Sequence, residues 1–174
     1  MKKSILSLAL AVIMVMALLT VGAFAEDTMT AEELQQALNA AASSENKVVT
    51  MTSNVTVTDA GLSSYGDAAI KVPEGVTLDG GNYKIIVENW SSTNQYHIVG
   101  VSSTASGSTT TIENLTIIGN ANTKSGIHAY KCVGTVAISG VTIMDCGNAA
   151  VQVNGSIVTA ENLTTSGNAW GAVN

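Results

Sequence analysis

A four-residue corner recurs five times along the chain, and this repeat constrains the fold more than any other feature. The copies are separated by 26, 34, 26 and 22 residues and read SNVT, DGGN, ENLT, SGVT and ENLT. Glycine adopts positive φ freely and asparagine does so more readily than most residues. We therefore expect a left-handed backbone corner at the second position of each copy, which is Asn54, Gly80, Asn114, Gly140 and Asn162.

Short strand-like runs surround every corner. They are rich in Val, Ile and Thr, alternate between apolar and polar residues, and are separated by turn residues. One run precedes the corner, one follows it, and a third, such as HIVGV at 97–101, completes the repeat. Three strands per repeat with no helix between them exclude βαβ units. The sequence predicts an all-β fold, a parallel β-helix of about five turns, over residues 47–174.

Residues 1–25 have the layout of a secretory signal peptide. MKK is followed by an apolar run from Ile5 to Gly22 and then by AFA, which places the expected cleavage site after Ala25. This predicts an exported protein that is secreted or held at the cell surface of a bacterium. The apolar run is also long enough to span a bilayer, so an uncleaved membrane anchor is the alternative.

Residues 26–46 are expected to form an N-terminal capping helix. Thr30 and Glu33 have the spacing of a capping box, which is typical of a helix start. The apolar residues that follow recur at i, i+3, i+4 and i+7, so one stripe of the helix should face the solenoid. These residues are Leu34, Ala37, Leu38 and Ala41.

The net charge of the chain limits the kinds of molecule that it can bind. The chain has 13 acidic side chains and seven lysines, with no arginine, and a net charge of −6. Removal of the signal peptide takes away two of the lysines and makes the charge about −8, which repels phosphate backbones. We therefore expect no nucleic-acid partner.

The repeat pattern resembles a known family. ELQQALNAA, VTLDGGNYKI and the recurring IENLTIIGN…GI turns are similar to the N-terminal part of right-handed parallel β-helix proteins of the pectin-lyase-like superfamily. The resemblance extends from about residue 30 to the end of the chain. It implies a right-handed helix and a polysaccharide as the ligand or substrate.

The same resemblance argues against an active site in these residues. Many pectate lyases of this fold use an arginine, or in some a lysine, as base beside Ca²⁺ bound by several aspartates. Polygalacturonases use closely spaced aspartates and a Gly-His-Gly segment. This chain has no arginine, no aspartate cluster on one strand and no Gly-His-Gly. We therefore predict no catalytic residue here, and an enzyme's active site would lie beyond Asn174.

The acidic residues beside the corners suggest one cofactor, calcium. Asp79, Glu113 and Glu161 occupy the same place beside the corner, so stacked turns could align their oxygens for Ca²⁺, as in some family members. Ser139 interrupts the column, and exposed acidic residues also serve solubility. We expect no cofactor, with calcium as the alternative.

Cys132 and Cys146 are expected to be small buried or half-buried thiols. The register separates them by about one strand length across stacked turns, which exceeds the reach of a disulfide. A disulfide is the alternative, because the protein is predicted to be exported. Their spacing fits no zinc pattern.

A ligand-binding surface is predicted beside the long loop at 88–97. Matching Ile98 with Ile127 brings His97 and His128 onto neighbouring turns and directs His128 outward. Aromatic rings with amide neighbours suit the faces and hydroxyls of sugars. The alternative is that Trp90 and Tyr96 only anchor the loop. The predicted binding residues are Trp90, Tyr96, His97, His128, Tyr130 and Gln152.

The last residues, GAVN, map onto the strand at Ala150 after a shift of 22 residues. The β-helix is therefore expected to be incomplete at its C-terminus, where further turns of a longer chain or another subunit would pack. The expected function is a secreted or cell-surface, adhesin-like module that recognises glycan or a host surface. The alternatives are the leading segment of a polysaccharide lyase or glycoside hydrolase, and a passive stalk.

Overall fold

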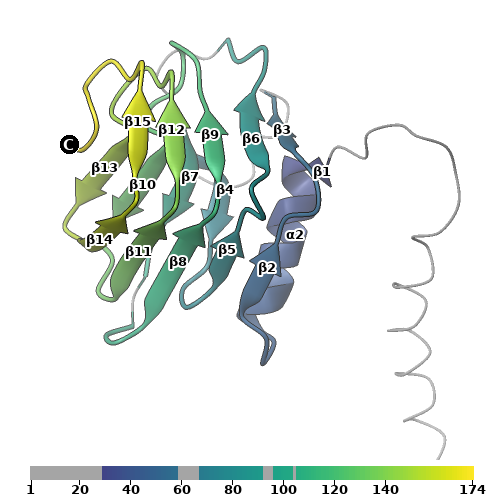
Figure 1. Ribbon diagram of the computed structural model, residues 1–174. Coiled ribbons are helices and arrows are strands. Elements are labelled where there is room, and N and C mark those ends of the chain that lie inside the picture. Colours follow the sequence, from purple (N-terminus) through teal and green to yellow (C-terminus); the bar gives the residue numbers. More distant parts are fainter. Residues whose placement is uncertain (1–28, 59–66, 92–95, 104) are drawn as a thin grey trace, which may run out of the picture.

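The computed structural model describes residues 29–58, 67–91, 96–103 and 105–174. Within these residues the strands form three sheets in which every pair is parallel, stacked as the turns of a solenoid (Figure 1). The predicted all-β parallel β-helix is thus confirmed. The signal peptide predicted at 1–25 lies outside the described residues.

Four successive turns of the solenoid each contribute one strand to each sheet, the last turn contributes a strand to two of them, and residues 29–30 add one more strand before the first turn. The six-stranded sheet has the order β1 (Met29–Thr30), β3 (Val55–Val57), β6 (Lys84–Val87), β9 (Thr116–Ile118), β12 (Thr142–Met144), β15 (Thr164–Ser166). The five-stranded sheet has the order β14 (Ile157–Glu161), β11 (Thr135–Ser139), β8 (Thr109–Glu113), β5 (Thr77–Asp79), β2 (Val48–Thr50). The four-stranded sheet has the order β13 (Val151–Asn154), β10 (Ile127–Tyr130), β7 (His97–Val101), β4 (Ala68–Val72).

The core consists of columns of aliphatic side chains that stack from turn to turn. Ile85 of β6 pairs with Ile117 of β9, which pairs with Ile143 of β12, and all three are fully buried. Period-two alternation places their neighbours, such as Thr116 and Thr142, on the partly exposed outer face. Burial of each such side chain contributes about 1.5–3 kcal/mol, so the columns supply the main driving force for stacking.

Three of the five predicted left-handed corners are confirmed. Asn114, Gly140 and Asn162 have φ of 50°, 61° and 53°. Each begins a two-residue connection between a strand of the five-stranded sheet and one of the six-stranded sheet, for example between β8 and β9. So short a connection has to reverse its backbone twist at a single residue.

The prediction is wrong for Asn54 and Gly80, neither of which has positive φ. The connections between β2 and β3 and between β5 and β6 are longer and spread the bend over more residues. In the second of these, Gly81 and Asn82 take φ of 56° and 68°. Gly80 is needed for another reason, because a Cβ there would lie 2.4 Å from the Asn114 carbonyl oxygen.

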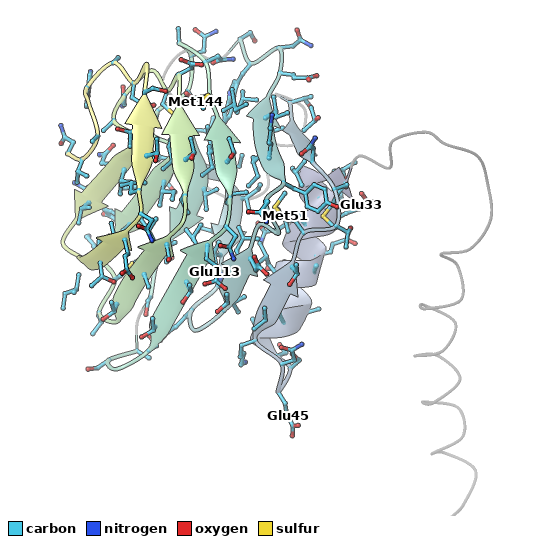
Figure 2. The ribbon with its side chains drawn as sticks, viewed as in Figure 1. Glu33, Glu45, Met51, Glu113 and Met144 are labelled. Atoms are coloured by element: carbon cyan, nitrogen blue, oxygen red, sulfur yellow. The ribbon has the colours of Figure 1, made fainter. Side chains whose placement is uncertain are left out.

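The helix α2 (Ala31–Ala42) covers the N-terminal end of the solenoid, and Glu33 lies in its first turn (Figure 2). The capping box is confirmed: Thr30 N–H donates to Glu33 Oε2, and Glu33 N–H donates to Thr30 Oγ1. The predicted stripe packs on the core, with Leu34, Leu38 and Ala41 buried and Ala37 half-buried. Among the described residues, no helix has the length and apolar character that crossing a bilayer requires.

Gln35 closes the edge of the four-stranded sheet. Its Nε2 donates to the Lys71 carbonyl oxygen at 2.9 Å, and its Oε1 accepts from the Lys71 N–H at 2.7 Å. The amide of Gln35 thus replaces the neighbouring strand that β4 lacks on this side. The sequence analysis missed this residue because it considered only the apolar positions of the helix.

The 22-residue register at the C-terminal end is also confirmed. Val151 pairs in parallel with Val173, and the Ala150 N–H donates to the Gly171 carbonyl oxygen. The contact is an isolated bridge, so GAVN does not form the full strand that the repeat predicted. Several apolar side chains of this end are exposed, namely Ile157, Trp170 and Val173.

We predict that Gln35→Ala destabilises the protein by about 2–4 kcal/mol, because it leaves two backbone groups of β4 without a partner. The matched control is Gln36→Ala, since Gln36 is exposed and makes only a 3.5 Å contact with Glu32. This control should change stability by less than about 0.5 kcal/mol. Urea unfolding of the two variants checks the prediction, and equal losses would contradict it.

Candidate functional site

The outer face of the four-stranded sheet carries most of the predicted binding residues. Its register differs by one residue from the expected one: Ile127 pairs with Val99, not with Ile98. Pairing Val99 and Val101 with Ile127 and Ala129 stacks four inward-facing side chains, and a one-residue slip would direct them to the opposite face. In the observed register His128 lies beside Gly100, where a Cβ would lie 2.6 Å from the Ala68 Cβ, so the close approach of Ala68 requires glycine at this position.

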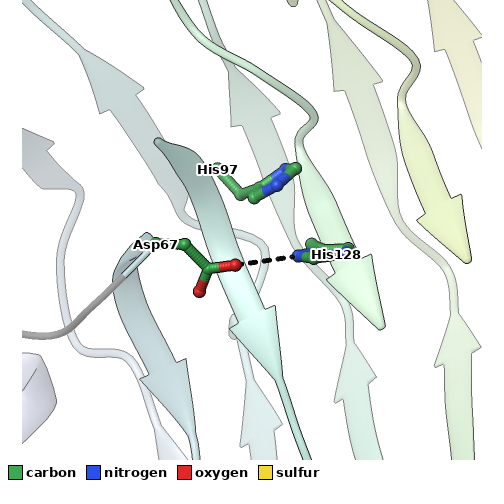
Figure 3. A group of neighbouring side chains, drawn as sticks. All are labelled: Asp67, His97 and His128. Atoms are coloured by element: carbon green, nitrogen blue, oxygen red, sulfur yellow. Dashed lines mark ion pairs between the residues drawn. The ribbon is translucent and has the colours of Figure 1, made fainter. Parts of the chain in front are cut away.

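Two histidines and an aspartate meet on this face. His97 is the first residue of β7, His128 lies within β10, and Asp67 directly precedes β4 (Figure 3). The imidazole rings stack with centroids 4.0 Å apart, and His128 Nδ1 lies 3.4 Å from Asp67 Oδ2. The sequence analysis missed Asp67, because it did not place the residues before β4 beside the histidines.

The histidines are less accessible than predicted. His97 is 3% exposed and His128 is 6% exposed. The outward direction predicted for His128 is consistent with its place between the inward-facing Ile127 and Ala129, but its ring is covered by the His97 ring on one side. The two rings therefore offer little surface to a ligand, and the binding role expected of His97 and His128 stays a prediction.

Polar side chains of neighbouring turns fix the proton positions of the two rings. Ser125 N–H donates to His97 Nδ1 at 3.2 Å, and Ser125 Oγ donates to Gln152 Oε1. Gln152 Nε2 donates to Asn154 Oδ1, so that oxygen is an acceptor and His128 Nε2, 2.9 Å away, has to carry a proton. Gln152, a predicted binding residue, thus holds the Asn154 side chain that accepts from His128.

His97 is held in its neutral form. Burial, followed by the charges of His128 and Lys124, lowers its pKa to about 3, and Asp67 acts in the opposite direction. At neutral pH the ring therefore carries one proton. Since its Nδ1 accepts the Ser125 N–H, that proton is on Nε2.

A pocket of about 440 Å³ opens beside this cluster. Tyr130 borders it and is 43% exposed, with its ring 5.5 Å from that of His128. Lys131 Nζ lies over the Tyr130 ring at 4.9 Å from the centroid. The other lining residues are Asp67, Lys71, Gly100, Val101, Ser102, Ser103 and His128. The pocket thus combines one aromatic surface with hydrogen-bonding groups that include lysines and a carboxylate.

Trp90 and Tyr96 do not lie on this surface as predicted. Trp90 is 2% exposed and belongs to the hydrophobic core, and Tyr96 is half-buried against it. Their rings are 6.2 Å apart and tilted, and the Trp90 carbonyl accepts from Asn122 Nδ2. An indole in the core is closed to a sugar, so the structure supports the alternative in which the two rings anchor the loop. Residues 92–95 of that loop lie outside the described residues.

The acidic column stacks as predicted. Asp79 pairs with Glu113, which pairs with Ser139, which pairs with Glu161. Protein donors already occupy the Asp79 carboxylate: the Gly81 N–H, Asn114 Nδ2 and Thr50 Oγ1. The Gly81 and Asn114 bonds lower the pKa of this carboxyl. Two of these donors are bonded to Oδ1 of Asp79, and the calcium alternative stays a prediction.

Cys132 and Cys146 are free and buried, which confirms the prediction of buried thiols without a disulfide. Burial, with a smaller contribution from the charge of Asp145, raises the pKa of the Cys146 thiol to about 12, while a hydrogen bond with Thr123 acts in the opposite direction. A neutral thiol is a poor nucleophile and a poor metal ligand. Cys146 is thus a packing residue.

Comparison with known proteins assigns no function to this chain. No family model, no curated protein and no solved structure shows a significant match to this chain. The class that the described residues define is a parallel β-solenoid with one capping helix.

We predict that Trp90→Ala costs about 3–5 kcal/mol, as expected for a large ring removed from a core. Trp90→Phe should cost less, since it keeps a ring and removes an indole N–H that has no hydrogen-bond partner among the residues that the structure describes. The exposed Trp170→Ala serves as the matched control and should be nearly neutral. Chemical denaturation measures all three variants, and a small effect of Trp90→Ala would show that the ring does not anchor the loop.

We also predict that iodoacetamide modifies Cys146 very slowly in the folded protein at mildly alkaline pH. The reason is that burial keeps its thiol protonated. Mass spectrometry after timed labelling checks this, with urea-unfolded protein as the fast reference. Ser166→Cys provides an exposed thiol near the same corner, and labelling of Cys146 at the rate of that control would contradict the prediction.

Proposed function

We propose that this chain is a secreted or cell-surface β-helix module that recognises a glycan through the outer face of its four-stranded sheet. The observation that carries the proposal is the pocket beside Tyr130. An aromatic ring with 43% of its surface exposed can stack on the C–H face of a sugar. Residues on a rigid sheet position such a ring at little entropic cost.

Polar groups around the pocket suit sugar hydroxyls. Lys71 and Lys131 supply ammonium donors, Asp67 supplies an acceptor, and Ser102 is an exposed hydroxyl that can do both. Binding sites for small ligands combine an apolar or aromatic surface with a few polar groups that converge on it. The pocket is open and shallow, which fits a saccharide at the end or along the side of a longer polymer.

Two further features favour an extracellular glycan as the partner. The first is the signal-peptide layout of residues 1–25. The second is the resemblance of the repeat pattern to the polysaccharide-active β-helix proteins of the pectin-lyase-like superfamily. That superfamily assignment is part of the proposal, and it also keeps open the role of leading segment of a lyase or hydrolase.

A glycan array tests the proposal with the parent protein, Tyr130→Ala and Tyr83→Ala. Tyr83 is a matched control because its ring is 39% exposed but lies outside the pocket. We expect Tyr130→Ala to lose at least about tenfold in affinity, or 1.4 kcal/mol, for the glycan that the parent binds, and Tyr83→Ala to bind like the parent.

Two outcomes would contradict the proposal. Equal binding by the parent and Tyr130→Ala would place recognition elsewhere on the molecule. Absence of any bound glycan on arrays of neutral and acidic polysaccharides would favour the passive stalk.

A further inference from the structure

The Asp67–His97–His128 cluster has donor atoms that a single metal ion can share. One ligand atom from each residue lies within 4.8 Å of the other two, and in the described part of the chain no other group of His, Cys, Asp and Glu side chains comes so close. The three residues come from three successive turns, so only the stacked fold assembles them. We propose that they form a binding site for a divalent transition-metal ion, with Zn²⁺ as the best fit.

Two hydrogen-bond acceptors, His128 Nδ1 and Asp67 Oδ2, face each other in this cluster. His128 Nε2 carries a proton because it donates to Asn154 Oδ1, which also accepts from Gln152. In the neutral ring the other nitrogen, Nδ1, then has a lone pair, and it faces Asp67 Oδ2 at 3.4 Å. Two lone pairs in this arrangement repel unless a positive charge lies between them. A second proton on His128 or a metal ion supplies that charge.

The distance between His128 Nδ1 and Asp67 Oδ2 also fits a zinc site. Zinc bonds to nitrogen and oxygen are about 2.0–2.1 Å long, so two ligands of a tetrahedral zinc ion are about 3.3–3.4 Å apart. His128 Nδ1 and Asp67 Oδ2 already have this separation. Half of a tetrahedral ligand set is therefore in place without movement of the backbone.

Gln152 and Asn154 resemble the outer partners of known metal-binding histidines. A ligating histidine usually donates its second ring N–H to an oxygen, which fixes the tautomer and aims the other nitrogen at the ion. The bond from His128 Nε2 to Asn154 Oδ1 has this role, and the Gln152 side chain holds Asn154 in turn. His128 is thus preorganised as an Nδ1 ligand.

His97 completes the site after a rotation of its ring. In the metal-free arrangement its Nδ1 accepts a long bond from the Ser125 N–H. The His97 ring is also stacked on the His128 ring. Binding therefore requires the His97 ring to turn away from Ser125, so that its lone pair points toward the ion between His128 and Asp67.

The ligand set determines which ion fits. Two imidazoles and one carboxylate suit zinc and its neighbours in the first transition row, whereas Ca²⁺ and Mg²⁺ prefer oxygen ligands. Asp67 is half-exposed, so the fourth position opens toward the pocket and can take water or a ligand oxygen. The site stands apart from the glycan proposal, since metal binding needs no sugar.

The test is a titration of untagged, EDTA-dialysed full chain with ZnCl₂ by calorimetry and with CoCl₂ by visible absorption. We expect one ion per chain and the d–d absorption of four-coordinate cobalt with nitrogen and oxygen ligands. Asp67→Asn and His128→Gln should each weaken zinc binding by more than about tenfold. Glu161→Gln is the matched carboxylate control, because Glu161 is exposed in β14 and remote from the cluster, and it should bind like the parent.

Circular dichroism of each variant verifies that the fold is retained. Asp67→Asn carries the test even if a histidine variant fails to fold, because Asp67 lies at the surface. Absence of both zinc heat and cobalt absorption would overturn the proposal. So would zinc binding that Asp67→Asn leaves unchanged, since the ion would then be bound elsewhere. Neither result depends on whether the protein binds a glycan.

Discussion

Parallel, in-register stacking of inward-facing aliphatic side chains is the constraint on which the rest of the structure depends. Ile85, Ile117 and Ile143 form one column, and Leu78, Ile112 and Ile138 form another on a second sheet. A turn of the solenoid cannot bury its apolar face alone, so each turn gains its stability from the next. The same register that stacks the core also stacks the outward residues, which is how histidines 31 positions apart come together.

Stacking leaves a row of unpaired backbone groups at each end of the sheets, and the N-terminal end shows how the chain deals with them. The apolar stripe of α2 covers the columns, while the Gln35 amide pairs with Lys71 as a neighbouring strand would. An edge strand covered in this way is closed to pairing with other chains. The helix therefore both completes the core and protects the edge.

The candidate site follows from the same geometry. The four-stranded sheet presents His128 between Gly100 and Gln152 of the adjacent strands. Gly100 lies too close to the Ala68 side chain to carry a Cβ, and the Asn154 side chain holds the His128 imidazole in one orientation. Of the proposed metal ligands, His128 lies within a strand, whereas Asp67 and His97 lie at strand ends, as do the pocket residues Tyr130 and Lys131. One face of one sheet carries both proposals.

The sequence by itself determined the repeat, and with it the parallel stacking, because apolar residues alternate with period two and the corners recur at similar spacing. It also determined the capping box, the buried thiols and the left-handed residues of the two-residue corners, since these depend on local patterns. The tertiary structure alone decided the one-residue shift that pairs Val99 with Ile127, the burial of Trp90 and the meeting of Asp67 with the two histidines. Loops of unequal length separate those residues, and no local pattern shows at which residue the strand after such a loop begins. The packing of the whole core sets the register between neighbouring strands.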